Sequence, residues 1–147
     1  MELNKVEELF GTLQQSVVSS WRKHLKTNSY AKHMALDEFY KEMPEKVDKL
    51  IEDYIGAHEN LDEYINILDG KTMDALEYLE TLRDLCKEGK EKFLGDQKEL
   101  ESDMDDILTF IDGIIYKVRQ LKESKTKLVS LKDYLTEAVN EEDDDDE

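Results

Sequence analysis

Apolar side chains recur every three or four positions along most of this chain, a spacing that predicts amphipathic helices. Three long helices are expected over residues 4–26, 30–55 and 96–123, and a further helix is expected to begin near Thr72. The cleanest alternation belongs to the last long helix, with apolar residues at Leu100, Met104, Ile107, Ile111, Ile114, Val118 and Leu121. These four segments predict an all-α protein.

Two shorter stretches carry the same spacing. Residues 57–70 are expected to form a short connecting helix between the second and third helices, and residues 128–139 a short fifth helix. Four long helices with a cross-connection of this length predict a four-helix bundle. We expect residues 1–139 to form this single domain, and residues 140–147 to be a disordered acidic tail.

Pro44 lies in the middle of the second predicted helix, where a proline removes one backbone hydrogen bond and bends the chain. Two interpretations are open: one kinked helix, or two shorter helices that meet at the proline. Because the apolar spacing continues through Pro44 in phase, the single kinked helix is the favoured prediction.

Composition narrows the classes of function. The 147 residues carry a formal net charge of -17 and one cysteine, Cys86, and no apolar run approaches the roughly 20 residues that span a bilayer. The lack of such a run means that no membrane association is expected. A surface this acidic repels phosphate backbones, so direct binding to nucleic acid is not expected either. The same charge could imitate DNA toward a basic protein partner. A single cysteine is typical of a cytoplasmic protein.

Candidate chemistry is confined to one row of side chains on the second helix. Cys86 lies in an apolar stripe, the glycines are scattered, and no cysteine or histidine cluster has zinc spacing. His33 and Asp37 are four residues apart, Asp48 and Glu52 are four apart, and eleven residues separate the pairs. Steps of four and eleven both return to the same face of an α-helix.

One chain cannot bring both pairs to one ion, because eleven helical residues rise roughly 16 Å. A two-fold axis near Pro44 would place His33 and Asp37 of one chain opposite Asp48 and Glu52 of a second, antiparallel copy. Imidazole and carboxylate ligands together suit iron, manganese or zinc. The alternative is that the row is a solvated helix edge held by pairs of side chains four residues apart.

The residues from Trp21 to Asp37, with Asp48 to Glu52, resemble the Dps family of iron-sequestering mini-ferritins. The resemblance implies a ferritin-like fold and an iron site shared between two subunits, with His24, His33 and Asp37 from one and Asp48 and Glu52 from the other. The link between His24 and His33 is shorter than the usual Dps loop, which leaves open whether His24 reaches the site. The amino-acid sequence as a whole, including residues 106–118, looks closer to an uncharacterised family of small phage-encoded proteins.

The leading hypothesis is therefore a Dps-like homo-oligomer, at least a dimer, that binds iron for sequestration or ferroxidase-type oxidation; another divalent metal would also fit. The alternative is a non-catalytic, acidic phage interaction protein on a ferritin-like scaffold, acting as a DNA mimic or host-factor inhibitor. A third is a virion or packaging component. The leading hypothesis and the first alternative place the protein in the cytoplasm of a bacterium or of a phage-infected cell.

Overall fold

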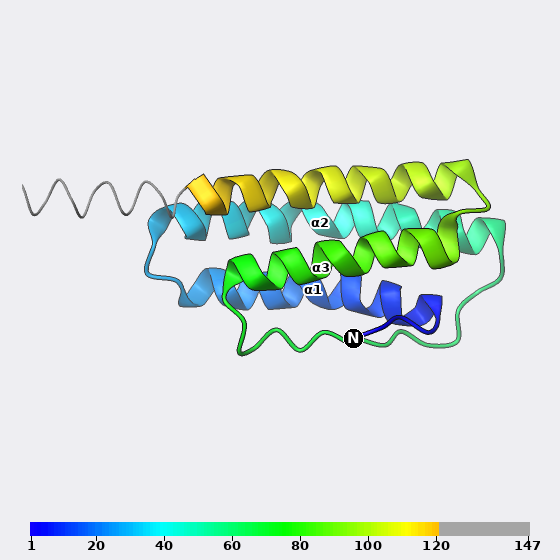
Figure 1. Cartoon of the computed structure of the whole chain (residues 1–147), viewed down its shortest axis with the longest axis horizontal. Helices are drawn as coiled ribbons and strands as arrows, with labels where there is room; N and C mark the ends of the chain where they lie inside the picture. Colours follow the sequence, from blue (N-terminus) through cyan, green and yellow to red (C-terminus); the bar gives the residue numbers. More distant parts are fainter. Residues whose placement is uncertain (121–147) are drawn as a thin grey trace, which may run out of the picture.

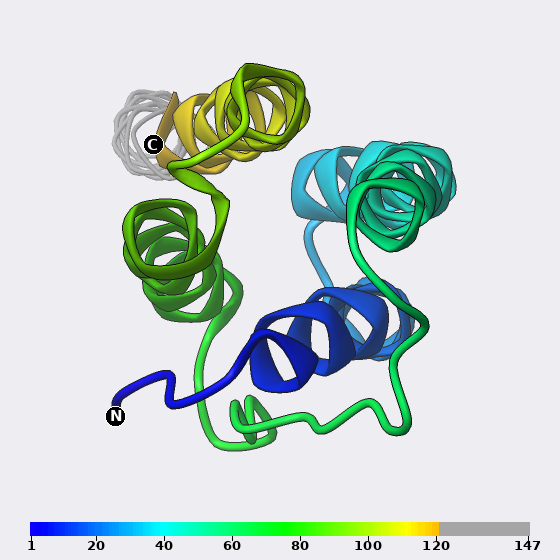
Figure 2. The same cartoon turned by 90° about the vertical axis from the view of Figure 1, so that its right-hand side faces the viewer.

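The computed structural model describes residues 1–120, and all of the regular structure in them is helical. α1 (Val6–Lys26) and α2 (Tyr30–Ala57) form an antiparallel pair joined by a three-residue link. α3 (Ala75–Gly89) continues directly into a π-helical turn, η1 (Lys90–Leu94), and a fourth helix occupies residues 98–120. The four long helices lie side by side (Figure 1), and the view along them shows them around one interior (Figure 2).

The all-helical prediction is confirmed for these residues, and no helix among them is both long and apolar enough to cross a bilayer. The predicted fifth helix (128–139) and the acidic tail (140–147) lie outside the described residues, so those two predictions remain open. α2 passes through Pro44 without a break, which confirms the single-helix interpretation.

The core forms where the apolar stripes of the four helices meet. Its fully buried members have at most 1% of their surface exposed, and they include Phe10, Leu13, Phe39, Met43, Leu79, Leu82, Met104, Ile107 and Ile111. Burying one such side chain stabilises the fold by about 1.5–3 kcal/mol before entropy is counted. The stripes predicted from spacing therefore set which face of each helix points inward.

Residues 58–74 contradict the predicted cross-connection helix: they run as an extended segment along α1 (Figure 1). Ile65 donates its backbone N–H to the Glu7 carbonyl at 3.1 Å, and Ile67 donates to the Thr12 hydroxyl at 3.0 Å. A Cβ on Gly11 would lie 2.2 Å from the Ile65 backbone, so this close approach requires glycine. The segment finds its hydrogen-bond partners on α1, and it therefore does not need a helix of its own.

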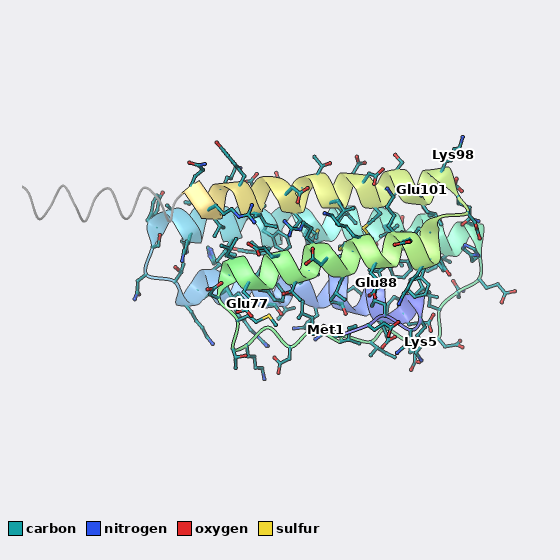
Figure 3. The ribbon with its side chains drawn as sticks, viewed as in Figure 1. Met1, Lys5, Glu77, Glu88, Lys98 and Glu101 are labelled. Atoms are coloured by element: carbon teal, nitrogen blue, oxygen red, sulfur yellow. The ribbon has the colours of Figure 1, made fainter. Side chains whose placement is uncertain are left out.

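The first residues of the chain are tied to the far end of α3. The Leu3 N–H donates to Glu88 at 3.1 Å, Lys92 donates to the Leu3 carbonyl at 2.9 Å, and the Leu3 side chain is buried. Figure 3 shows Met1, Lys5 and Glu88 in this region, and charged side chains such as Lys98 projecting outward from the bundle. The third helix itself begins at Ala75 and not at Thr72, because Asp74 caps it by accepting from the Glu77 N–H at 2.8 Å.

Candidate metal centre

The turn between α1 and α2 brings two histidines face to face. His24 lies in the last turn of α1 and His33 in the first turn of α2, and their rings stack with centroids 3.6 Å apart. His24 is 6% exposed, and His33 is half-buried. Ser29 starts α2 by accepting from the Lys32 N–H, which fixes how soon His33 follows the turn. The short link therefore brings His24 directly against His33.

Each histidine ring is held by the backbone of the other. The His24 Nδ1 lies 2.9 Å from the His33 carbonyl oxygen, and the His33 Nδ1 lies 3.0 Å from the His24 carbonyl oxygen. A carbonyl can only accept, so both Nδ1 atoms carry the proton and donate. The His24 carbonyl is one of the unpaired acceptors at the end of α1, so this bond also caps the helix. A neutral ring in this tautomer leaves the lone pair on Nε2, the arrangement that metal-binding histidines use.

Asp37 adds a carboxylate to this pair. Its Oδ1 lies 4.0 Å from the His24 Nε2, the limit for one ion with bonds of about 2 Å to each atom, which would have to lie midway on the line between them. The same oxygen lies 3.0 Å from the Lys41 Nζ, and the Tyr40 hydroxyl donates to it at 3.3 Å. The hydrogen bond from Lys41, then the charge of Lys41 and the hydrogen bond from Tyr40, lower the pKa of Asp37 against the raising effect of burial. Asp37 is therefore anionic at neutral pH, and Lys41 competes with any cation for it.

Asp48 and Glu52 lie elsewhere on α2, as their spacing requires. Both are exposed and line a pocket of about 480 Å³ whose other walls come from α1, α2 and Tyr64. Most of these walls are apolar: Val17, Val18, Pro44, Val47, Ile51 and Ile55. Within residues 1–120 of one chain, no three His, Cys, Asp or Glu side chains are placed to hold a metal ion. One chain thus presents two separate parts of the predicted ligand set.

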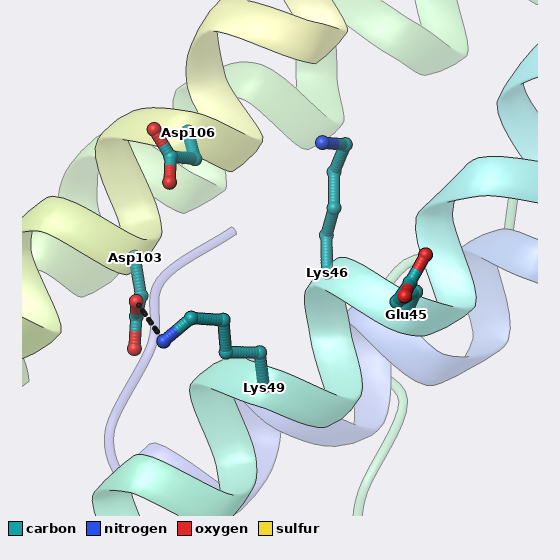
Figure 4. A pocket seen from close by; sticks show the side chains of 5 residues that line it. All are labelled: Glu45, Lys46, Lys49, Asp103 and Asp106. Carbon is teal, nitrogen blue, oxygen red and sulfur yellow. Dashed lines mark ion pairs between the residues drawn. The ribbon is translucent and has the colours of Figure 1, made fainter.

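A second charged cluster on α2 escaped the sequence prediction. The Lys49 Nζ lies 2.8 Å from Asp53 and 3.1 Å from Asp103 of the fourth helix, at a pocket also lined by Glu45, Lys46 and Asp106 (Figure 4). Asp103 is 8% exposed, and its second oxygen has no hydrogen-bond partner. Burial and the nearby Asp53 raise the pKa of Asp103, whereas the pKa of Asp53 is lowered.

A signal for this cluster was present in the sequence. Asp103 stands three residues after Leu100 and four before Ile107, inside the apolar stripe of the fourth helix, where an acid requires a partner. Lys49 supplies that partner and occupies the position that a cation would need. The cluster is therefore an internal tie between α2 and the fourth helix.

The described residues form an all-helical bundle in which two stacked histidines, with Asp37 nearby, lie at the turn between the first two helices. The chain belongs to a family of unknown function (DUF5856), whose family model matches residues 24–118.

A curated relative comes from Enterobacteria phage T4. This uncharacterised 14.6 kDa protein in the mobD-ri intergenic region is 36% identical over 53 residues, which cover 36% of this chain and 41% of that protein. The alignment thus spans about two fifths of the relative's length. No solved structure matches the chain. The expected likeness to phage-encoded proteins is supported, and the ferritin-like relationship remains a prediction.

Proposed function

We propose that the protein is a Dps-like iron-binding protein whose sites form between two copies of the chain. The observation that carries the proposal is the histidine pair: both Nδ1 atoms are committed to carbonyls, which leaves both Nε2 atoms for a ligand role, and the His24 Nε2 lies 4.0 Å from the Asp37 carboxylate. This arrangement is stronger support than the spacing of the residues alone. A solvated helix edge would not need two imidazoles fixed in the same tautomer.

The outer face of α1 and α2 supports the pairing of two copies. The apolar pocket beside Asp48 and Glu52 is open on this face, and Trp21, 49% exposed, stacks on Tyr40 at 5.8 Å. Two antiparallel copies with an axis near Pro44 would cover these apolar groups, and stable interfaces bury about 1,200–2,000 Å² in total. In the same arrangement Asp48 of the partner subunit and Glu52 of the partner subunit would face His33.

Iron is the substrate in this proposal. Imidazole and carboxylate ligands suit Fe(II) and leave coordination positions for water or an oxidant. Each Fe(II) gives up one electron, and one hydrogen peroxide takes up two electrons and two protons to give water. The formal charge of -17 raises the local concentration of cations around the protein.

The test is an anaerobic Fe(II) titration followed by peroxide, with the ferric band recorded in the near ultraviolet. Wild type is expected to bind stoichiometrically, and the double variant Asp48→Ala and Glu52→Ala to lose tight binding. A matched control, Glu42→Ala with Glu59→Ala, removes the same charge from exposed positions outside the site and is expected to bind like wild type. Unchanged titration curves in the site variant would contradict the proposal.

The charge of -17 and the similarity to a phage protein favour one second candidate. In it the protein binds a basic host protein through its acidic surface, as a DNA mimic or host-factor inhibitor, and has no turnover. A pull-down from bacterial lysate is the check. Recovery of no nucleic-acid-binding protein would count against this function.

A further inference from the structure

A third pocket, of about 480 Å³, opens between the C-terminal half of α1 and residues 66–71 of the connection. Four basic side chains line it, Arg22, Lys23, Lys26 and Lys71, and we call it the basic pocket. Asp69 is the one acid among its lining residues. In a chain with a net charge of -17, a pocket with this local excess of positive charge is unexpected.

Within residues 1–120, no ion pair neutralises the charges of the basic pocket, although the charges of Asp74, Asp69 and Glu77 raise the pKa of Lys23 against the effect of burial. None of the four basic side chains forms an ion pair with any residue in 1–120, although lysines elsewhere, such as Lys90 and Lys92, do. The Asp69 carboxylate is engaged in the turn, where it accepts from the Lys71 backbone N–H at 3.2 Å. The pocket therefore offers positive charge to something outside these residues.

Lys23 holds the two walls of the pocket together. Its Nζ donates to the carbonyls of Gly70 and Met73, both at 2.6 Å, and lies 5.3 Å from the centroid of the Tyr78 ring. Burial, and then the charge of Lys26, lower the pKa of Lys23. The turn at residues 70–73 is thereby fixed against α1, and Lys71 is fixed across the pocket from α1.

Helix electrostatics account for only part of this arrangement. Lys23 and Lys26 lie in the last turn of α1, where basic residues complement the partial negative charge of a helix C-terminus. This effect fades beyond the last turn of the helix, and it does not explain Lys71, which comes from a segment 45 positions further along the chain than Lys26. Two elements therefore contribute cations to one pocket.

We propose that the basic pocket binds a small molecule that carries two or more linked phosphate groups. Arg22 offers a planar guanidinium that can donate two parallel hydrogen bonds to one phosphate, and Lys26 and Lys71 add point charges for the next. Gln15 and Asn66, which also line the pocket, supply neutral polar groups. The volume lies in the usual range for small-molecule sites, about 300–1,000 Å³.

The acidic surface outside the basic pocket limits the ligand to a small molecule. Charges separated by more than about 8 Å are largely screened at physiological salt, so a ligand inside the pocket interacts mainly with the four cations. A long nucleic acid would extend over the acidic surface outside the pocket and be repelled there. This inference uses none of the proposed iron ligands and does not depend on the proposed function.

The experiment is calorimetric titration of the full chain with sodium tripolyphosphate, at physiological salt and with EDTA present to exclude metal ions. Wild type is expected to show saturable binding at one site. The double variant Arg22→Gln and Lys71→Gln should bind at least about tenfold more weakly, because each cation contributes charge-assisted hydrogen bonds. The single variant Lys26→Gln should weaken binding by a smaller factor.

The matched control is Lys87→Gln with Lys98→Gln, two exposed lysines that form no ion pair within residues 1–120. This control removes the same charge and is expected to bind within about twofold of wild type. Absence of saturable binding by wild type, or equal weakening in the pocket and control variants, would overturn the proposal. Tighter binding of a single-stranded DNA oligonucleotide than of tripolyphosphate would also overturn it. Because EDTA removes iron, the tripolyphosphate titration does not test metal binding. A negative result would therefore not count against the proposed iron site.

Discussion

Two parts of α2 carry the same short pattern, an aspartate and a lysine four residues apart, and use it in opposite ways. Asp37 pairs with Lys41 at 3.0 Å beside the stacked histidines, and Asp53 pairs with Lys49 at 2.8 Å beside Asp103. At the first position the neighbours are imidazoles with available nitrogen atoms. At the second the neighbour is a buried acid from another helix. The neighbours, and not the pattern, set the environment of each carboxylate, and under the proposed function only the histidine end would exchange its lysine for a metal ion.

The energetic reason is the cost of an unpaired buried charge. Lys41 is 61% exposed and pairs with one carboxylate, so it can move into water with little loss. Lys49 neutralises Asp103, which is 8% exposed, and removing one partner of a buried pair leaves the other uncompensated. Lys41 at the histidine end of α2 can therefore be displaced at little cost, whereas Lys49 at the other end is needed to compensate the charge of Asp103.

The largest expected effect separates the two ends by iron binding. His24→Ala removes one proposed ligand nitrogen and the ring that stacks on His33, so Fe(II) affinity should fall by at least about 100-fold. Asp53→Ala at the other end should leave Fe(II) affinity unchanged. Both are measured by the anaerobic titration. Equal losses in the two variants would show that the difference between the ends does not concern metal.

A smaller effect is expected from replacing each lysine. Lys41→Met releases the Asp37 carboxylate, so Fe(II) affinity should rise about two- to fivefold, the range expected for losing one exposed ion pair. Lys49→Met should give no gain in metal affinity and should lower the urea midpoint of unfolding, because Asp103 loses its counter-charge. Fe(II) binding created by Lys49→Met would contradict the interpretation of that cluster as an internal tie.

The smallest expected effects concern how stability depends on pH. Ionisation of Asp37 and ionisation of Asp103 should change the free energy of unfolding in opposite directions. The pKa of Asp37 is lowered, so its ionised form stabilises the fold at neutral pH, and this stability is lost as the pH falls through the folded-state pKa. The pKa of Asp103 is raised, so its ionised form opposes folding, and this cost disappears as the pH falls toward the unfolded-state pKa.

Asp37→Asn should therefore lower the free energy of unfolding at pH 7, and Asp103→Asn should raise it slightly. Urea unfolding at neutral pH and again near pH 3 provides the measurement, with both differences expected to shrink in acid. A loss of stability in Asp103→Asn at pH 7 would mean that the attraction of Lys49 outweighs the cost of burying the acid.

The long helices could be predicted because their cause is local. The intervals of three and four between apolar residues predicted the buried faces of α1, α2 and the fourth helix, and Pro44 did not break α2 because the apolar face continues beyond it. The positions of Asp37, Asp48 and Glu52 along one helix followed from the same geometry. Because α2 is continuous, the two residue pairs lie apart along it, and their role as ligands stays a prediction.

The connection between α2 and α3 could not be predicted in this way. Residues 58–74 contain apolar residues at helical intervals, yet their backbone lies against Gly11 and bonds to Glu7 and Thr12. A contact between segments more than fifty positions apart leaves no local periodicity, so the predicted cross-helix was wrong. The basic pocket went unnoticed for the same reason, since its walls come from α1 and this extended segment.

The sequence by itself determined the class of structure, the inward faces of the long helices and the row of candidate ligands on α2. These properties depend on neighbours three, four or eleven positions away, and the geometry of a helix converts such spacing directly into space. Only the tertiary structure decided that His24 stacks on His33 with both Nδ1 atoms committed, and that Asp103 meets Lys49. Both contacts depend on how separate helices are placed against each other, and the chemistry of each carboxylate follows from that placement.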